Sequence, residues 1–194
     1  MTMSTTRLWG AHNALTAYGP RYLIMWLGAM VWRCQSRRPA QLLATGARLF
    51  DWRVCRRGGR WYGAHGVVTL RVDPVAELDC LVAVAPDGEQ LTVRLILERG
   101  DAAARADFKW LCAMLEAKYP PGRVRFIGGN YKPSWERLHR FAADDIGDDI
   151  EQRIGSMDAR RPWGKLWPWL WSRLYDRSDT AGRAGQRPLL RDFI

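Results

Sequence analysis

The sequence predicts an α/β fold built around a parallel sheet, either open or closed into a barrel. Short apolar segments typical of strands alternate along the chain with segments of helical periodicity. Charged residues and histidines come at the ends of several strand-like segments, which is where such folds place functional residues. With 194 residues, of which 47% are hydrophobic, the chain is expected to form a single domain with a sizeable core.

The first part of the chain predicts two strands and two helices. Residues 8–11 are expected to form a short strand that ends at His12, and the apolar run 22–32 a buried helix. Residues 39–45 predict a second short helix, which a glycine ends. Residues 48–54 predict the next strand, which ends in charged residues.

A hairpin is expected to follow that strand. The pair Gly58-Gly59 is typical of a tight turn. Residues 60–62 and 67–72 are expected to be extended, with His65 between them.

The middle of the chain carries the clearest signals. Residues 73–84 predict a helix, because a capping aspartate is followed by proline at the first helical position. Residues 91–97 predict a strand that ends at Glu98. Residues 101–119 predict an amphipathic helix, with apolar side chains repeating at helical spacing.

The last third of the chain is less regular. Residues 123–127 predict a strand, residues 135–143 a helix, and residues 188–194 a final strand that holds Asp192. A basic stretch, residues 160–175, lies before that strand. Its tryptophans either pack in the core or form an anchor at a membrane surface, and they are Trp163, Trp167, Trp169 and Trp171.

The formal net charge of +10 indicates an anionic partner, such as a phospholipid surface, a phosphorylated substrate or nucleic acid. No recognised nucleic-acid motif supports the last of these. The four cysteines are far apart and lack zinc-ligand spacing, which favours reduced thiols. No leader is expected, and the longest apolar run is about half of a membrane span. A cytoplasmic protein is therefore expected, with peripheral membrane contact as an option.

The residues at the strand ends suggest cleavage of a phosphodiester. Such a reaction needs a base, a cation for the phosphate and an acid for the leaving oxygen. His12 and His65 suit the proton transfers because an imidazole titrates near neutrality, and Arg53 suits a phosphate because its planar fork donates two hydrogen bonds.

A structural alternative exists for each of these residues. A histidine at a strand end can simply be structural or exposed. Asp51 and Arg53 alternate with apolar residues, so they could line one polar face of a solvated channel. Glu98 could be a charge near a helix N-terminus.

Taken together, the motifs resemble the catalytic X-region of the phosphatidylinositol-specific phospholipases C, over roughly residues 8–100. The matching segments are Gly10-Ala11-His12-Asn13, Cys34-Gln35, Gln41-Leu42, residues 46–53 (GARLFDWR) and His65-Gly66. The resemblance implies a single domain over residues 1–194, with a compact or distorted (βα)8 TIM-type barrel whose helices are reduced. It also implies a phosphoric diester hydrolase of phospholipase C type.

The resemblance assigns roles to five residues. His12 would be the base that activates the inositol 2-hydroxyl, and His65 the acid that releases the diacylglycerol oxygen. Arg53 falls where metal-independent bacterial members carry an arginine in place of calcium. Asp51 would help to orient these groups. Asp192 is a candidate for the late aspartate that pairs with the first histidine.

The metal and head-group residues are less well defined. Asn13, Asp51 and Glu98 match oxygen ligands of calcium-dependent members, which keeps Ca²⁺ open as an alternative. A fixed charge on Arg53 would repel such an ion, so a site without metal or cofactor is expected. Five residues are candidates for substrate binding, partly by location alone: Asn13, Glu98, Arg99, Tyr131 and Lys132.

Three functions remain open at this point. The first is a phosphodiesterase acting on a phospholipid head group or a similar phosphodiester, held at the membrane by basic charge and tryptophans. The second is a related barrel enzyme that hydrolyses glycerophosphodiesters. The third is a catalytically reduced barrel that binds anionic lipid or a protein partner without turnover.

Overall fold

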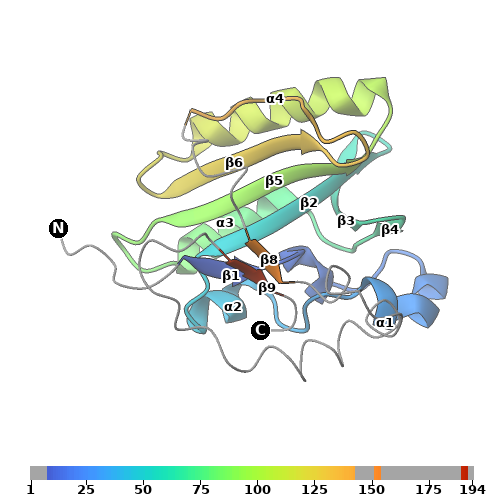
Figure 1. Cartoon of the computed structure of the whole chain (residues 1–194), viewed down its shortest axis with the longest axis horizontal. Helices are drawn as coiled ribbons and strands as arrows, with labels where there is room; N and C mark the ends of the chain where they lie inside the picture. The colour runs from blue at the N-terminus through green and yellow to red at the C-terminus, as the bar shows by residue number, and fades with distance from the viewer. Residues whose placement is uncertain (1–7, 143–150, 154–188, 192–194) are drawn as a thin grey trace.

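A single sheet with parallel middle strands forms the centre of the fold (Figure 1). The computed structural model describes residues 8–142, 151–153 and 189–191. The strands are β1 (Trp9–Ala11), β2 (Leu49–Arg57), β3 (Arg60–His65), β4 (Val68–Thr69), β5 (Leu91–Arg99), β6 (Val124–Tyr131), β7 (Glu136–Arg137), β8 (Glu151–Arg153) and β9 (Leu189–Arg191). The helices are η1 (Ala14–Ala17), η2 (Leu23–Gly28), α1 (Ala29–Trp32), α2 (Pro39–Ala44), α3 (Pro74–Val84) and α4 (Ala102–Lys118).

The described strands form an open sheet. Seven of them lie side by side in the order β7-β6-β5-β2-β1-β9-β8, and the β3–β4 hairpin continues from β2. All pairings from β6 to β8 are parallel, whereas β7 turns back antiparallel to β6. The closed barrel implied by the family resemblance is therefore not present in the described part of the chain, which has the open form of the sheet. The row of described strands ends at β7 on one side and at the three-residue β8 on the other.

The two faces of the sheet differ because side chains alternate along each strand. One face packs against α3 and α4 and holds the main core, which includes Phe50, Trp52, Val54, Leu91, Val93, Leu95, Leu78, Leu81, Phe108 and Leu111. The intervening residues of β2 and β5 face the other way and include four buried charged side chains, Asp51, Arg53, Arg94 and Glu98. Burial of charges on one face alone indicates a polar site there.

The two long helices confirm the sequence prediction, including their first residues. The Asp73 carboxylate accepts hydrogen bonds from the Val75 and Ala76 amides at the start of α3. Asp101 accepts one from the Ala104 amide at the start of α4. These bonds satisfy amides that have no partner within the helix, so the two caps define where the helices begin.

The apolar run 22–32 does not form the buried helix predicted for it. It consists of the 3-10 helix η2 and the single turn α1, and η2 is largely exposed. Leu23 is 73% exposed and Leu27 is 83% exposed. None of the helices in the described part of the chain is both long enough and apolar enough to cross a bilayer. The apolar composition of residues 22–32 predicted a buried helix, but the apolar side chains of η2 are exposed at the surface of the protein.

The helix predicted over residues 135–143 is also wrong. The chain instead forms β7 and a loop, because the amides of Leu138 and His139 both donate to the Gly129 carbonyl of β6. Trp135 has a φ of 54°, which begins this reversal and is incompatible with a helix. The final strand is confirmed as β9, although Asp192 lies outside the described residues.

Candidate active site

Two strands approach the same edge of β2 from opposite ends and leave an opening between them. β1 pairs with β2 as far as Ala11 opposite Phe50, and β3 pairs with β2 from Gly63 opposite Val54. His12 directly follows β1 and His65 ends β3, so both histidines lie at this opening. Their ring centroids are 6.4 Å apart, with the rings nearly perpendicular at 87°. Residues distant in sequence thus meet because two strand ends share one edge.

The Arg53 side chain extends from β2 into this opening and contacts three site residues. Its Nε lies 2.8 Å from Asp51 Oδ2, and its Nη1 lies 3.4 Å from Glu98 Oε2. Its Nη2 lies 2.9 Å from His12 Nε2. A guanidinium can only donate hydrogen bonds, so Nε2 of His12 must carry a lone pair in this arrangement.

Asp51 is fully buried, with cations on two sides. Burial alone would raise the pKa of its carboxyl group, but the Arg53 and Arg94 guanidinium groups hold that pKa well below its usual range. The amide of Asn13 also donates to Oδ2 at 3.2 Å. Asp51 is therefore a permanent carboxylate that fixes Arg53 and lies 3.6 Å from His12 Nε2.

Glu98, near the end of β5, links three parts of the site. Its Oε2 faces Arg53, and its Oε1 accepts from the Gly66 amide at 2.6 Å. Lys132 forms an ion pair with the same Oε1. Because Gly66 follows His65, Glu98 holds the second histidine in place relative to Arg53.

The His65 ring is oriented by main-chain and thiol contacts. Its Nδ1 lies 2.5 Å from the Trp32 carbonyl, which can only accept a hydrogen bond, so Nδ1 carries a proton. The Cys34 Sγ lies 3.9 Å from the same nitrogen. Desolvation of the ring, together with the neighbouring His12 ring and the Arg53 guanidinium, lowers the pKa of His65 to about 4. In the free protein His65 is therefore neutral at pH 7, with its Nε2 unprotonated.

The structure brings together most of the residues that the sequence singled out, but not all. One cluster, joined by hydrogen bonds, ion pairs and the contact of the two histidine rings, contains His12, Asn13, Asp51, Arg53, His65, Glu98 and Lys132. Arg99 is bonded instead to Gly66 O, Val68 O, Cys55 and Thr69, and so braces the β3–β4 hairpin. The Tyr131 hydroxyl donates to the Gly100 carbonyl, and its ring lies under Arg105. The groups of Arg99 and Tyr131 proposed to hold substrate are thus engaged with the protein itself.

Asp192 and the four tryptophans between residues 163 and 171 lie outside the described residues. One buried residue of the site was missed from the sequence. Arg94 is paired in register with Asp51, and its Nη1 lies 3.9 Å from Asp51 Oδ1. Its guanidinium also lies 5.9 Å from the centre of the exposed Trp135 ring. The alternation of polar and apolar residues along β5 was the signal that could have identified it.

The site does not fit a calcium ion. Arg53 already occupies the space between the carboxylates of Asp51 and Glu98, 2.8 and 3.4 Å from their oxygens. A divalent cation there would face a fixed positive charge at contact distance. Within the described residues, no group of three or more His, Cys, Asp or Glu side chains is placed to hold a metal ion.

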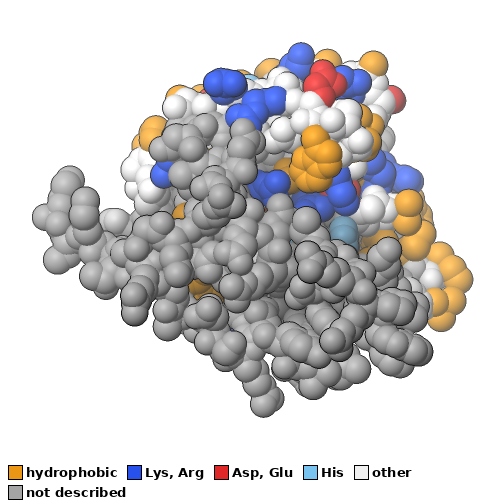
Figure 2. Space-filling model, viewed as in Figure 1, with side chains coloured by type: hydrophobic (Ala, Val, Ile, Leu, Met, Phe, Trp, Pro, Cys, Tyr) orange, Lys and Arg blue, Asp and Glu red, His pale blue; other side chains and the backbone are white. Residues whose placement is uncertain are grey.

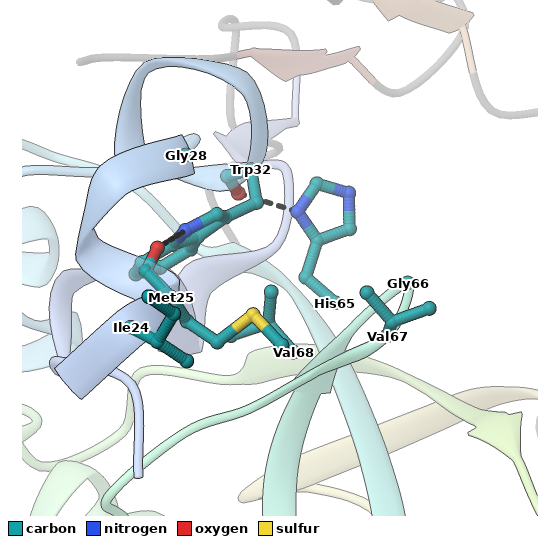
Figure 3. A pocket seen from close by; sticks show the side chains of 8 residues that line it. All are labelled: Ile24, Met25, Gly28, Trp32, His65, Gly66, Val67 and Val68. Carbon is teal, nitrogen blue, oxygen red and sulfur yellow. Dashed lines mark hydrogen bonds between the residues drawn. The ribbon is translucent and has the colours of Figure 1, made fainter. Parts of the chain in front are cut away.

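An apolar pocket of about 400 Å³ lies beside His65, between η2 and the turn after β3. Figure 3 shows the His65 ring at one side of it, with its Nδ1 directed to the Trp32 carbonyl. The remaining lining is almost entirely apolar: Ile24, Met25, Gly28, Trp32, Gly66, Val67 and Val68. The pocket can accept a hydrocarbon group attached to whatever reacts at His65.

No protein-family model matches the chain, and a search of curated proteins also finds no match. Solved structures do match. The phosphatidylinositol-specific phospholipase C of Listeria monocytogenes superposes with a TM-score of 0.65 at 12% identity, over 98% of this chain and 91% of that one. The S. aureus enzyme of the same name, from work on modulation of its membrane binding, gives a TM-score of 0.50 at 13% identity. That match covers 74% of this chain and 50% of the other.

These comparisons confirm that the chain has the fold of bacterial phosphatidylinositol-specific phospholipases C. The resemblance first drawn from short motifs therefore extends to nearly the whole chain as a likeness of structure. At such low identity the likeness concerns the fold. The chemistry has to be argued from the residues of this chain.

Proposed function

We propose that this protein is a metal-independent phosphoric diester hydrolase of phospholipase C type. The observation that carries the proposal is the placement of His12 and His65 on either side of one opening, 6.4 Å apart, with the Arg53 guanidinium beside them. Two imidazoles and a guanidinium are the groups that in-line displacement at a phosphodiester requires. The fold likeness supports the same class of reaction.

His12 is the base in this proposal. Its Nε2 lone pair, which accepts from Arg53 in the free protein, takes the proton of the attacking hydroxyl. The hydroxyl oxygen then bonds to phosphorus while the ester bond to the leaving oxygen breaks. Arg53 turns its Nη2 from His12 to a phosphate oxygen and stabilises the charge of the transition state, while Asp51 keeps its Nε in place.

His65 is the acid. Its pKa of about 4 leaves it neutral in the free protein, because it is desolvated and faces positive charge. An anionic diester bound against Arg53 offsets that charge, so the pKa of His65 rises and its Nε2 takes up a proton. It then gives this proton to the leaving oxygen. When the attacking hydroxyl belongs to the substrate itself, the product is a cyclic phosphodiester.

A lipid is the substrate class that the surroundings favour. The apolar pocket beside the acid His65 lies on the side where the leaving group must depart, which suits a diacylglycerol. The exposed apolar residues of η2 border this pocket and form a surface suited to a membrane. Figure 2 shows uncovered hydrophobic side chains along the right-hand edge of the molecule, where Figure 1 places α1 and β4. Inositol phospholipid is the head group we propose, on the strength of the fold likeness.

Cleavage of inositol phospholipid vesicles tests the proposal. Wild-type protein is expected to release a water-soluble phosphate product with or without a chelator, whereas His12→Ala and His65→Ala lose at least about 100-fold in rate. His139→Ala is the matched control, because that histidine contacts Glu116 and lies outside the cluster. Loss of activity in chelator would contradict the metal-free site. Vesicle binding without turnover by wild-type protein would favour the reduced, non-catalytic alternative.

A further inference from the structure

A second pocket, separate from the active site, is lined almost entirely by arginine and tyrosine. It has a volume of about 580 Å³ and lies between the residues before η2 and the β2–β3 hairpin. Its lining consists of Arg21, Tyr22, Arg57, Gly58, Arg60 and Tyr62. The two walls are joined through a third segment: the Arg21 amide donates to the Thr69 carbonyl and the Arg71 amide to that of Gly19, while the Leu70 amide donates to the Gly63 carbonyl of β3. The pocket is therefore part of the folded scaffold.

Among the residues that the structure describes, none neutralises the positive charge of this pocket. Arg21, Arg57 and Arg60 are exposed, and the ion pairs found among the described residues include none of the three. Carboxylates are also missing from the pocket lining. Three guanidinium groups around one hollow attract a phosphate, because each can donate two parallel hydrogen bonds to its oxygens.

The tyrosines do not make this a site for a cationic head group. The Arg21 guanidinium lies 4.7 Å from the centre of the Tyr62 ring, and that of Arg57 lies 6.0 Å from the centre of the Tyr22 ring. The ring faces that would bind a choline ammonium are thus covered by the protein's own cations. The tyrosines instead hold the arginines in place over the hollow, which favours an anion.

The neighbours of the pocket identify the source of that anion. Tyr22 leads directly into η2, where Leu23 is 73%, Ile24 67% and Leu27 83% exposed. Apolar side chains that border a cationic pocket suit a membrane, since they enter the acyl region while the pocket meets the head groups. A nucleic acid would leave these apolar residues in water. We therefore propose that this pocket binds the head group of an anionic phospholipid in the membrane surface.

This head-group site lies apart from the catalytic cluster. Arg57 is four residues beyond Arg53 on the same strand, which corresponds to about 13 Å. One lipid can therefore occupy the pocket while another occupies the active site. The consequence is that an anionic lipid that is not a substrate should strengthen attachment to the membrane.

Binding to vesicles without inositol lipid tests this inference separately from catalysis. Phosphatidylcholine vesicles with and without phosphatidylglycerol are titrated with wild-type protein, the double variant Arg57→Gln/Arg60→Gln, and a control of equal charge, Arg37→Gln/Arg140→Gln. The control arginines are exposed and line neither this pocket nor η2. Circular dichroism is used to check that all of these proteins fold.

The pocket variant is expected to lose about 5-fold in affinity per arginine, or roughly 25-fold in total, only on vesicles with phosphatidylglycerol. The control variant is expected to lose far less affinity for the same vesicles. Equal losses in both variants would overturn the inference, since net charge alone would then explain binding. Retained vesicle binding with a selective loss of oligonucleotide binding would overturn it in favour of a nucleic acid. Failure of catalysis with lipid binding intact would contradict the proposed enzymatic function alone.

Discussion

The Nη2 atom of Arg53 lies 2.9 Å from Nε2 of His12, in a site where both side chains are almost completely buried. This contact defines the protonation state of the proposed base, because the guanidinium can only donate. It also places the phosphate-binding cation beside the atom that must accept the proton of the nucleophile. The two histidines differ in their contacts: His12 accepts from Arg53 at Nε2, whereas His65 carries its proton on Nδ1 and donates it to the Trp32 carbonyl. This difference assigns them different roles.

Arg53→Lys tests the guanidinium fork. Lysine keeps the charge but cannot bridge Asp51, Glu98 and His12 at once, so kcat/KM is expected to fall by about 100- to 1,000-fold. Steady-state kinetics on inositol phospholipid measures the loss. Arg105→Lys, at a partly exposed position on α4 outside the cluster, serves as control and should retain full activity. An Arg53→Lys variant with wild-type kcat/KM would contradict the role given to this residue.

Acidification tests the environment of His65. Its pKa is lowered from about 6.5 in the unfolded chain to about 4 in the folded protein, so between these values the unfolded state binds more protons. The free energy of unfolding should therefore fall as the pH decreases from 7 to 5, with His65 accounting for roughly 1–2 kcal/mol.

Urea unfolding at pH 7 and at pH 5 measures this loss in the free energy of unfolding. The loss between the two pH values should be smaller in His65→Gln than in the wild type. Asp51 does not contribute over this range, because its lowered pKa matters only below the ordinary value of an aspartate near 3.8. A pH dependence that is identical in the wild type and in His65→Gln would contradict the environment described for this ring.

Gly10→Ala tests the close contact of β1 with β2. A Cβ atom at residue 10 would lie 1.5 Å from the Leu49 carbonyl oxygen, so the two strands would have to separate. We expect a loss of several kcal/mol in the free energy of unfolding, together with loss of activity, since β1 leads into His12. Gly122→Ala is the control, because its Cβ would meet no neighbour within 4 Å. Equal stability of both variants would show that β1 is not packed as described.

Leu23→Gln and Leu27→Gln test the exposed apolar surface of η2. Because both side chains are in water in the free protein, their replacement should leave thermal stability unchanged within about 0.5 kcal/mol. Vesicle binding should weaken by roughly 10-fold for each residue that enters the acyl region. Val84→Gln, at an exposed position on α3, should bind vesicles as the wild type does. Unchanged vesicle binding in the η2 variants would exclude this surface as the membrane contact.

Local signals in the sequence predicted much of the fold. A capping aspartate followed by proline predicted α3, and apolar side chains at helical spacing predicted α4; short apolar segments that end in charged residues predicted β2 and β5. Apolar composition failed for residues 22–32, because it cannot distinguish a core helix from an exposed one. The sequence also could not decide between an open sheet and a closed barrel, since strand order and closure depend on distant pairings such as β1 with β9.

Part of the candidate site could also be predicted from local signals in the sequence. Residues at strand ends were identified because parallel strands place them at one edge, as for His12 and Glu98. Arg94 lies in the middle of β5 and was missed, although its register with Asp51 brings it to the site. Arg99 and Tyr131 were assigned by location, and their bonds to main-chain carbonyls depend on side-chain directions that the sequence does not reveal.

The assignment of His12 as base and His65 as acid is tested most directly with a substrate whose leaving group needs no proton. A diester with a thiolate or nitrophenolate leaving group should restore most of the activity of His65→Ala, because the acid is then dispensable. It should not restore His12→Ala, which lacks the base. Rescue of His65→Ala alone is the result we predict from the geometry. Equal rescue of both variants, or of neither, would contradict the assignment of base and acid across the opening in the sheet.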